Sequence, residues 1–411
     1  MRPRRLYMDY AATSFPKPPG VLEAMIRYAT ELGASPGRGS YQESVEAGRL
    51  LKLCRGRIRQ LIHGERDEQV IFTLNCSDAL NLGIKGVVRP GDHVITTELD
   101  HNSILRPLNQ LVADGVVTQT RLPCDPVTGA ADPDDLRRAI RPETRLIAVL
   151  HGSNVTGTLQ PIAEFGQIAR EHNVLFLVDA AQTLGHVPLH VRAMHIDLLA
   201  APGHKGLLGP LGTGFLYIRP GVERQMKSLR EGGTGSASER DTQPEFLPDR
   251  FEPGSHNTPG IVGLSEGVAY LLDRRVQAMW QHERDVMVAF NDTLSHDDAP
   301  GLRLYGPRTI DARCAVFSIR VDGFEDPREL STVLEREYGI LTRSGLHCAP
   351  GAHGTIGTAS HGGTTRLSFG AFTTVDEARF AARSIAQVCR SQAARTPRIE
   401  RRGHGRTATV A

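Results

Sequence analysis

Hydrophobic and polar positions follow a repeating order between residues 68 and 217. A short run of consecutive apolar residues ends in polar residues, and a segment of helical character follows. Four units have this order: "QVIFTLNCSDALNLGIKGVV", "DHVITTELDHNSILRPLNQLV", "RLIAVLHGSNVTGTLQPIAEFGQIAREH" and "NVLFLVDAAQTLGHVPL". "IDLLAAPGHKG" adds a further apolar run with a polar end. Apolar runs without alternation are typical of strands buried on both faces, so the pattern predicts an α/β fold with a mostly parallel sheet covered by helices.

The pattern changes after about residue 272. "CAVFSIRVDGF", "DPRELSTVLEREYG" and "TTRLSFGAFTTVDEARFAARSIAQVCR" indicate a smaller α+β unit. We expect a large domain over residues 18–272, and a small domain formed by residues 1–17 together with 273–390. Residues 391–411 are basic, small and polar, which predicts a disordered tail.

Composition and charge narrow the functional classes. The chain has 411 residues, of which 23% are charged and 40% hydrophobic, as in ordinary soluble proteins. The net charge of +2 gives no reason to expect nucleic acid as a partner. Without an apolar run of roughly 18 residues or an apolar stretch near the N-terminus, we expect no membrane segment and a cytoplasmic protein. Six scattered cysteines with no CxxC pair argue against a zinc ribbon or a disulfide framework.

The polar ends of the apolar runs are the first indication of a site. In open α/β sheets, ligands bind beyond the carboxyl ends of the strands. Five such ends carry hydrogen-bonding or ionisable groups: residues 75–78, 100–103, 153–156, 179–182 and 203–205. We therefore expect five loops to converge on one crevice.

Lys205 lies in the Gly/Pro-rich segment "LLAAPGHKGLLGPLGTGFLY". The segment does not match GxxxxGK[ST], which argues against a nucleotide-binding P-loop. A lysine in a desolvated pocket has a lowered pKa and can attack a carbonyl to form a Schiff base. Pyridoxal phosphate is a cofactor that uses such a lysine.

This cofactor makes three demands that the chain meets. Its pyridine nitrogen requires a carboxylate, and Asp179 ends the most apolar run, "VLFLVD". Its phosphate requires backbone amides at a helix start, and Ser77 lies at a predicted strand-to-helix junction. Its 3′-oxygen requires a donor, for which Asn154 and Gln182 are available.

These residues match a known family. "DHNS", "SNVTGT", "DAAQ", "GHK" and "RSGLHCAP" occur in family order over most of the chain. The sequence resembles the class V aminotransferase group of fold-type I pyridoxal-phosphate enzymes, and most closely the cysteine desulfurases. The resemblance implies a fold with a large cofactor-binding domain and a smaller domain that carries a catalytic cysteine.

Cofactor contacts follow from the resemblance. Lys205 would form the Schiff base, Asp179 would pair with the pyridine nitrogen, and His101 would stack on the ring and move protons. Asn154 and Gln182 would contact the 3′-oxygen and the substrate side.

The phosphate would be held by Ser77, the Cys76 backbone and His204, with Ser255 reaching it across a homodimer interface. Pro202 stands where the family has a serine, and it offers neither a hydroxyl nor an N–H. One phosphate contact is therefore lost or replaced, with Cys76, Thr234 or Ser236 as possible substitutes.

Cys348 is the candidate nucleophile. It follows His347 in "ILTRSGLHCAPGAHG", a Gly/Pro-rich loop unlike the apolar settings of Cys54 and Cys389. Arg343 and His347 are expected to favour the thiolate. A metal site of Cys348, His353 and His361 is the alternative, but its spacing fits no standard zinc pattern, and we expect no metal.

The reaction implied by the resemblance converts L-cysteine to L-alanine. Lys205 or His101 removes the α-proton, and Cys348 takes the sulfur as a persulfide. Arg366, in "TRLSFG", matches the family's carboxylate-binding arginine, and Arg343 is expected to order the cysteine loop. The short loop is also compatible with selenocysteine as the substrate and with a partner protein that accepts the persulfide sulfur.

Three enzyme alternatives share this fold: an aminotransferase, an epimerase or racemase, and a β-lyase. A catalytically inactive sulfur carrier or scaffold is a more distant one.

Overall fold

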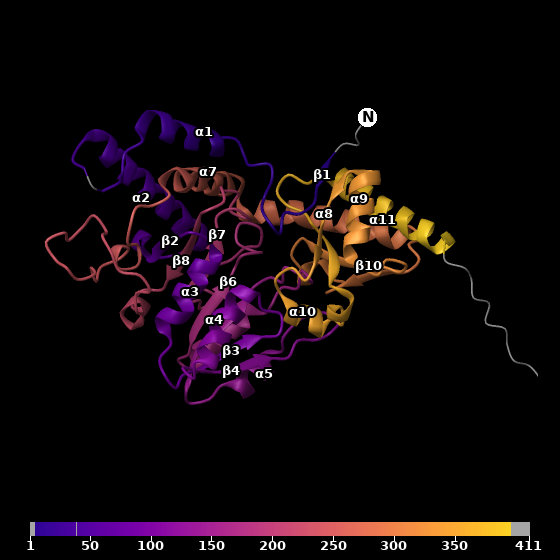
Figure 1. Ribbon diagram of the computed structural model, residues 1–411, viewed down its shortest axis with the longest axis horizontal. Coiled ribbons are helices and arrows are strands. Elements are labelled where there is room, and N and C mark those ends of the chain that lie inside the picture. Colours follow the sequence, from indigo (N-terminus) through magenta and orange to yellow (C-terminus); the bar gives the residue numbers. More distant parts are fainter. Residues whose placement is uncertain (1–4, 38, 396–411) are drawn as a thin grey trace, which may run out of the picture.

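The computed structural model describes residues 5–37 and 39–395 of the chain. Two parts with separate hydrophobic cores lie side by side (Figure 1). The larger part is built on a sheet between residues 70 and 218, and the smaller part on a sheet between residues 302 and 368.

Within the described residues, seven strands form the large sheet in the order β2-β8-β7-β6-β5-β3-β4. Strand β8 runs antiparallel to both of its neighbours, and the strands from β7 to β4 are parallel to one another. The carboxyl ends of β2, β3, β5, β6 and β7 therefore share one edge. The strands are β2 (Val70–Thr73), β3 (His93–Thr97), β4 (Thr118–Leu122), β5 (Thr144–Leu150), β6 (Leu175–Asp179), β7 (Leu198–Pro202) and β8 (Gly214–Ile218).

Both faces of the large sheet are buried. In β5, Ile147 and Val149 belong to one hydrophobic cluster, whereas Leu146 and Ala148 belong to another. This alternation follows from the two-residue period of a strand and explains why the strand sequences are apolar throughout. The helices of this part are α1 (Val21–Arg27), α2 (Gln42–Ile62), α3 (Cys76–Val87), α4 (Asn102–Ala113), α5 (Pro133–Ala139), α6 (Ile162–Glu171) and α7 (Thr258–Arg274).

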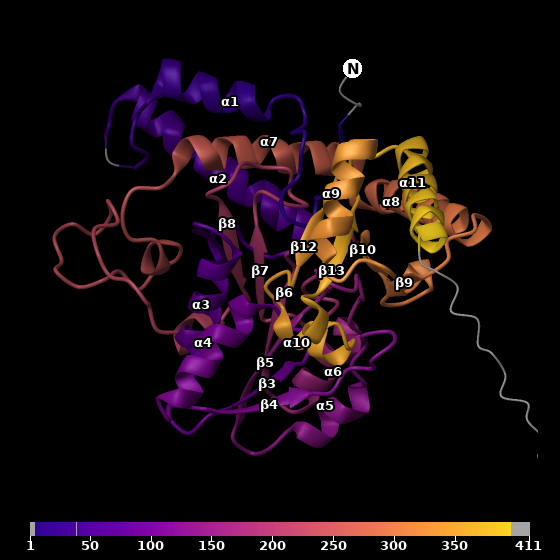
Figure 2. The same ribbon diagram turned by 45° about the vertical axis from the view of Figure 1, so that its right-hand side comes forward.

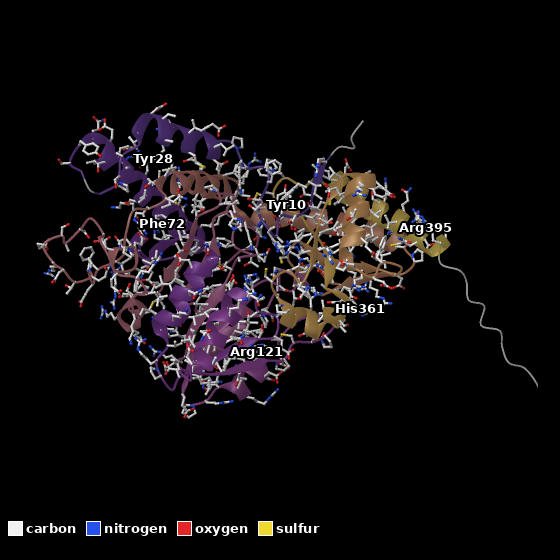
Figure 3. The ribbon with its side chains drawn as sticks, in the orientation of Figure 1. Tyr10, Tyr28, Phe72, Arg121, His361 and Arg395 are labelled. Atoms are coloured by element: carbon white, nitrogen blue, oxygen red, sulfur yellow. The ribbon has the colours of Figure 1, made fainter. Side chains whose placement is uncertain are left out.

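The small unit has an antiparallel sheet in the order β12-β13-β10-β9 (Figure 2). In addition, β1 pairs with β11 in parallel. Its strands are β1 (Leu6–Tyr7), β9 (Leu302–Tyr305), β10 (Val316–Val321), β11 (Ile340–Leu341), β12 (Arg343–Gly345) and β13 (Thr364–Ser368). Its helices are α8 (Val276–His296), α9 (Pro327–Tyr338), α10 (Pro350–Thr355) and α11 (Val375–Arg395). Tyr10 lies where this unit meets the larger part (Figure 3).

The predicted α/β class with a mostly parallel sheet is confirmed. One detail of the pattern is wrong: after β6 the chain makes turns instead of a helix and passes directly to β7. Helix α11 extends to Arg395, so residues 391–395 are helical and not part of a disordered tail. The rest of that tail lies outside the described residues, and the domain boundaries stay a prediction. No helix in the described part is both long and apolar enough to cross a bilayer.

We predict that Phe290→Ala destabilises the small unit by about 3–5 kcal/mol, because the fully buried ring packs against Phe317 and Phe369. Urea unfolding followed by circular dichroism measures the change. The matched control is Phe380→Ala on α11, where the ring is 45% exposed and the cost should stay below about 1 kcal/mol. Equal effects of the two substitutions would contradict this description of the core.

Candidate active site

A cavity opens at the carboxyl edge of the large sheet, where the five predicted loops meet. Each loop contributes to its wall: Asn75, Cys76 and Ser77; His101 and Ser103; Asn154; Asp179, Ala181 and Gln182; and Pro202, His204 and Lys205. The sequence-based expectation that these strand ends converge is therefore confirmed. Four predicted site residues do not line this cavity: Ser255, Arg343, Cys348 and Arg366.

Lys205 and Asp179 face the same cavity from neighbouring parallel strands. Asp179 ends β6, and Lys205 follows β7 by three residues. Burial lowers the pKa of the Lys205 ammonium, and Asp179 opposes that change. Burial raises the pKa of the Asp179 carboxyl, against a hydrogen bond from the Ala181 N–H at 2.9 Å and the charge of Lys205. The cavity thus favours a more nucleophilic lysine and leaves the aspartate in need of a cationic or proton-bearing partner.

Glycines allow the chain to close around this cavity. A Cβ on Gly214 of β8 would lie only 2.7 Å from the carbonyl carbon of Asn75, so a larger residue would displace the loop before α3. A Cβ on Gly206 would overlap the Leu184 carbonyl oxygen and the His186 ring. Gly206 follows Lys205 directly, so the bare backbone sets how closely the lysine loop approaches the turn after β6.

His101 is the N-cap of α4. Its Nδ1 accepts a hydrogen bond from the Ser103 backbone N–H at 3.0 Å, and the Ser103 hydroxyl lies 3.0 Å from the same atom. Burial, followed by the charges of Lys205 and Arg343, lowers the pKa of His101 to about 4. The ring is therefore neutral near pH 7, and because Nδ1 is an acceptor, the proton resides on Nε2.

The start of α3 forms one end of the cavity. Asn75 caps the helix by accepting from the Asp78 N–H at 3.0 Å, while Cys76 and Ser77 are the first two helical residues. First-turn N–H groups have no acceptor within a helix and attract anions. The Ser77 hydroxyl lies 2.6 Å from the Ser103 hydroxyl. Ser103 was not predicted as a site residue from the sequence. Its position two residues after the N-cap His101 is the signal for it, because that backbone N–H is placed to donate to the cap side chain.

Three other cavity residues have polar groups that bond to the surroundings of the site or have no partner there. Gln182 donates from Nε2 to the Ala11 carbonyl at 3.0 Å, and so reaches the N-terminal segment. Buried atoms without a hydrogen-bond partner among the described residues include Asn154 Oδ1 and His204 Nδ1. Burial lowers the pKa of His204 to about 4, so its ring is neutral.

Cys348 is an exposed residue of the loop between β12 and α10, and its neighbours His347 and Ala349 are buried. Its φ is +60° and that of His347 is +49°, two consecutive left-handed residues that are not glycine. The Asn102 N–H donates to the Cys348 carbonyl at 2.9 Å, and Asn154 Nδ2 donates to the His347 carbonyl at 2.6 Å. The two peptides that flank Cys348 are thereby tied to α4 and to the cavity wall.

The expectation that His347 helps to form the Cys348 thiolate is wrong. His347 is buried, its Nε2 lies 3.1 Å from the Thr364 carbonyl, and burial lowers its pKa to about 2. A ring that stays neutral supplies no positive charge to a neighbouring thiol. The pKa of His347 is lowered mainly by its burial, which the spacing of residues in the sequence does not show.

Arg366 and Arg343 face each other across the antiparallel ladder of β13 and β12. Arg366 is 1% exposed; its Nη2 contacts Asp9 Oδ1 at 2.6 Å and its Nη1 donates to the Asn154 carbonyl at 3.1 Å. The Nε of Arg366 is buried without a partner among the described residues. Two guanidinium groups beside one carboxylate leave an excess of positive charge, which suits an anion. Asp9 was not identified from the sequence, because nothing local links it to residue 366.

The remaining candidates lie elsewhere in this chain. Ser255, Thr234 and Ser236 line a separate surface cavity. Thr234 and Ser236 bond to each other through their hydroxyls at 3.1 Å, and Ser236 also bonds to Asp249. Within one chain, neither residue lines the cavity that contains Pro202 and Lys205.

The alternative metal set is not brought together. The His353 Nδ1 pairs with the Thr358 hydroxyl at 2.7 Å, and His361 is exposed. No cluster of three or more His, Cys, Asp or Glu side chains suited to a metal occurs in residues 5–37 and 39–395.

The sheet with its converging strand ends and its second, smaller unit has the fold-type I architecture of pyridoxal-phosphate enzymes. Residues 6–379 match the aminotransferase class V family, and the chain belongs to this pyridoxal-phosphate-dependent family.

Similar proteins lie among the cysteine desulfurases. A "probable cysteine desulfurase" of Methanothermobacter thermautotrophicus is 34% identical over 387 residues, covering 93% of this chain and 94% of its own. A cysteine desulfurase of Yersinia pseudotuberculosis is 32% identical, covering 84% of each chain. The apo structure of a cysteine desulfurase from Thermococcus onnurineus superposes with a TM-score of 0.87 at 30% identity, covering 94% of this chain and 95% of that one. The cysteine desulfurase CsdA of Escherichia coli gives a TM-score of 0.82 at 25% identity, covering 94% of each.

We predict that the protein loses stability as the pH falls from about 6.5 to 4. Burial lowers the pKa values of His101, His151, His204 and His353 to about 4. Between pH 6.5 and 4 these histidines bind protons in the unfolded chain and stay neutral in the folded chain. Above pH 6.5 they are neutral in both states. Thermal unfolding at stepped pH measures the slope. His151→Asn removes one such group, so its slope should be shallower; an unchanged slope would contradict this assignment.

Proposed function

We propose that the chain is a pyridoxal-phosphate-dependent cysteine desulfurase that converts L-cysteine to L-alanine and receives the sulfur on Cys348 as a persulfide. The observation that carries the proposal is the attachment of the Cys348 loop to the Lys205 cavity. Asn102, next to His101, and Asn154, in the cavity wall, hold the two peptides that flank the thiol. The reactions of an aminotransferase, an epimerase or a β-lyase do not require a thiol on a loop that is bonded to the cavity wall.

The cavity residues fit the cofactor. Lys205 would hold its aldehyde carbon, Asp179 its ring nitrogen, and the first turn of α3 at Cys76 and Ser77 its phosphate, with His204 Nδ1 as an unused polar atom nearby. Asn154 and Gln182 would contact the 3′-oxygen. When bound, pyridoxal phosphate supplies a carbonyl for the substrate amine and a ring that accepts the electron pair of the α-carbon.

Lys205 is the better of the two candidates for removing the α-proton. Its lowered pKa leaves a larger fraction of free amine near pH 7. His101 carries its proton on Nε2 and uses Nδ1 for the Ser103 N–H, so it has no free acceptor nitrogen. We assign to His101 the stacking role and the donation of a proton from Nε2.

The substrate carboxylate would bind at Arg366, with Arg343 opposite. The unpartnered Nε of Arg366 and the charge excess of the pair leave a place for an anion beside Asp9. The Nη1 of Arg366 is bonded to the Asn154 carbonyl, so this subsite and the cofactor cavity share one backbone segment.

Cys348 would then attack the sulfur of the substrate. A bond forms between Cys348 Sγ and the substrate Sγ, the substrate Cβ–Sγ bond breaks, and its electron pair stays on the substrate carbon. Protonation of that carbon gives L-alanine, while the enzyme keeps the sulfur as a persulfide. Because Cys348 is exposed, the terminal sulfur remains accessible to a reductant or an acceptor protein. Ser255 would reach the phosphate of a second copy in a homodimer.

We predict that the cofactor-loaded protein forms alanine and sulfide in equal amounts from L-cysteine and a reductant. Cys348→Ser should lower both at least ~100-fold, because the oxygen cannot form the persulfide. Cys389→Ser, a change at a buried cysteine of α11, is the matched control and should keep full turnover. Sulfide with pyruvate, unaffected by Cys348→Ser, would instead indicate a β-lyase, and turnover of selenocysteine alone a selenocysteine lyase.

We predict that Arg366→Lys raises the KM for L-cysteine by about 10-fold or more, because an ammonium cannot present a donor at the position of Nε while it also bonds Asp9 and the Asn154 carbonyl. Steady-state kinetics measures the KM, and the visible absorbance of the bound cofactor shows whether the variant is folded and loaded. A loaded variant with an unchanged KM would rule out Arg366 as the carboxylate site.

A further inference from the structure

Cys76 is a second thiol in the cavity, and the proposed reaction makes no use of it. It is the first residue of α3 and lines the same wall as Lys205 and Asp179. Its backbone N–H belongs to the helix end proposed for the phosphate. Its thiol, which the sequence offered as a substitute for the contact missing at Pro202, contacts Asp179 instead.

The Cys76 side chain contacts the carboxylate expected to serve the cofactor ring. Cys76 Sγ lies 3.5 Å from Asp179 Oδ1, and both residues are more than nine-tenths buried. The Ala181 N–H donates to the same oxygen at 2.9 Å. Both described hydrogen bonds of this carboxylate therefore end on Oδ1, and Oδ2 remains for a ligand.

The position of this thiol is fixed by the loop before α3. Asn75 caps the helix and packs on Gly214, where a Cβ would meet the Asn75 backbone. The cap and this packing hold the backbone that carries Cys76, so only rotation about its Cα–Cβ bond can move Sγ away from Asp179.

The charge state of the pair supports a donor role for sulfur. Burial raises the pKa of the Cys76 thiol well above its usual value, and the negative charge of Asp179 adds to this, so the proton stays on sulfur. Burial also raises the pKa of Asp179, and the bonds from Ala181 and Cys76 act against that change. A donor to a carboxylate stabilises its ionised form.

We propose that Cys76 is a positioning residue whose thiol keeps Asp179 ionised and turned so that Oδ2 receives the ring nitrogen of pyridoxal phosphate. The proposal rests on the proposed function, because it assigns that ring nitrogen to Asp179. The thiol is a weak donor, so it orients the carboxylate and leaves most of its charge for the ring.

The contact itself is testable without the cofactor. The S–H stretching band of Cys76 in the infrared spectrum of the apoprotein is identified as the band lost in Cys76→Ala. Asp179→Ala should move this band to higher frequency, because the hydrogen bond is gone. A band at the same position in the native chain and in Asp179→Ala overturns the proposal.

The effect on the ring is tested with cofactor labelled with ¹⁵N at the ring nitrogen. Cys76→Ala should shift the ¹⁵N resonance toward the unprotonated ring and weaken cofactor affinity by about 3- to 10-fold, while Cys76→Ser, which restores a donor, should return both to native values. Cys54→Ala, a buried cysteine of α2 outside the cavity, is the matched control and should change neither.

An unchanged resonance in loaded Cys76→Ala overturns the inference alone. Failure of the native chain to take up cofactor overturns the proposed function and the inference with it.

Discussion

The cavity is organised around two ionisable side chains, a lysine and an aspartate, that are buried away from water. Neighbouring parallel strands deliver them to the same edge, because Asp179 ends β6 and Lys205 follows β7. Burial lowers the pKa of Lys205 and raises that of Asp179, so it favours the neutral form of both. The charge of each residue opposes the pKa shift of the other. A bound group that forms a covalent bond with the amine and gives the carboxylate a positive partner relieves both penalties. The rest of the architecture keeps water out and brings the other loops to this pair.

The small unit contributes through backbone as much as through side chains. Two carbonyls of the cysteine loop are hydrogen-bonded by Asn102 and Asn154, which belong to the large part. His347 and Cys348 adopt left-handed backbone there, a conformation that persists only when its surroundings enforce it. The thiol is thus carried by a strained, anchored loop and not by a freely moving one.

Much of the fold and the cavity could be predicted from the sequence, because both depend on local patterns. Uninterrupted apolar runs identified β2, β3, β5, β6 and β7, and the polar residues after them proved to meet. Strand β4 was not identified, since its sequence "TQTRL" lies at the sheet edge and carries no apolar run. The turns after β6 were read as helical because periodicity cannot separate a turn-rich segment from a short helix.

What the sequence could not supply depends on distance in space. The neutral state of His347 follows from its burial, and the pairing of Arg366 with Asp9 joins residues from opposite ends of the chain. The contact between Cys76 and Asp179 crosses two strands of the sheet order, so no local pattern reveals it. Ser255 stays a prediction, because its proposed role requires a second copy.

The pairing of β1 with β11 has a consequence for how the protein is made. Leu6 lies opposite Ile340, Met8 accepts from the Ser368 N–H at 2.9 Å, and Asp9 meets Arg366. During synthesis the first segment leaves the ribosome early and its partners leave late, so it stays unpaired until nearly the whole chain exists. Long-range pairing of this kind slows folding and leaves an edge exposed in the interim. A chain that stops before β13 lacks Arg366, so the arginine subsite forms only in chains that extend beyond residue 368.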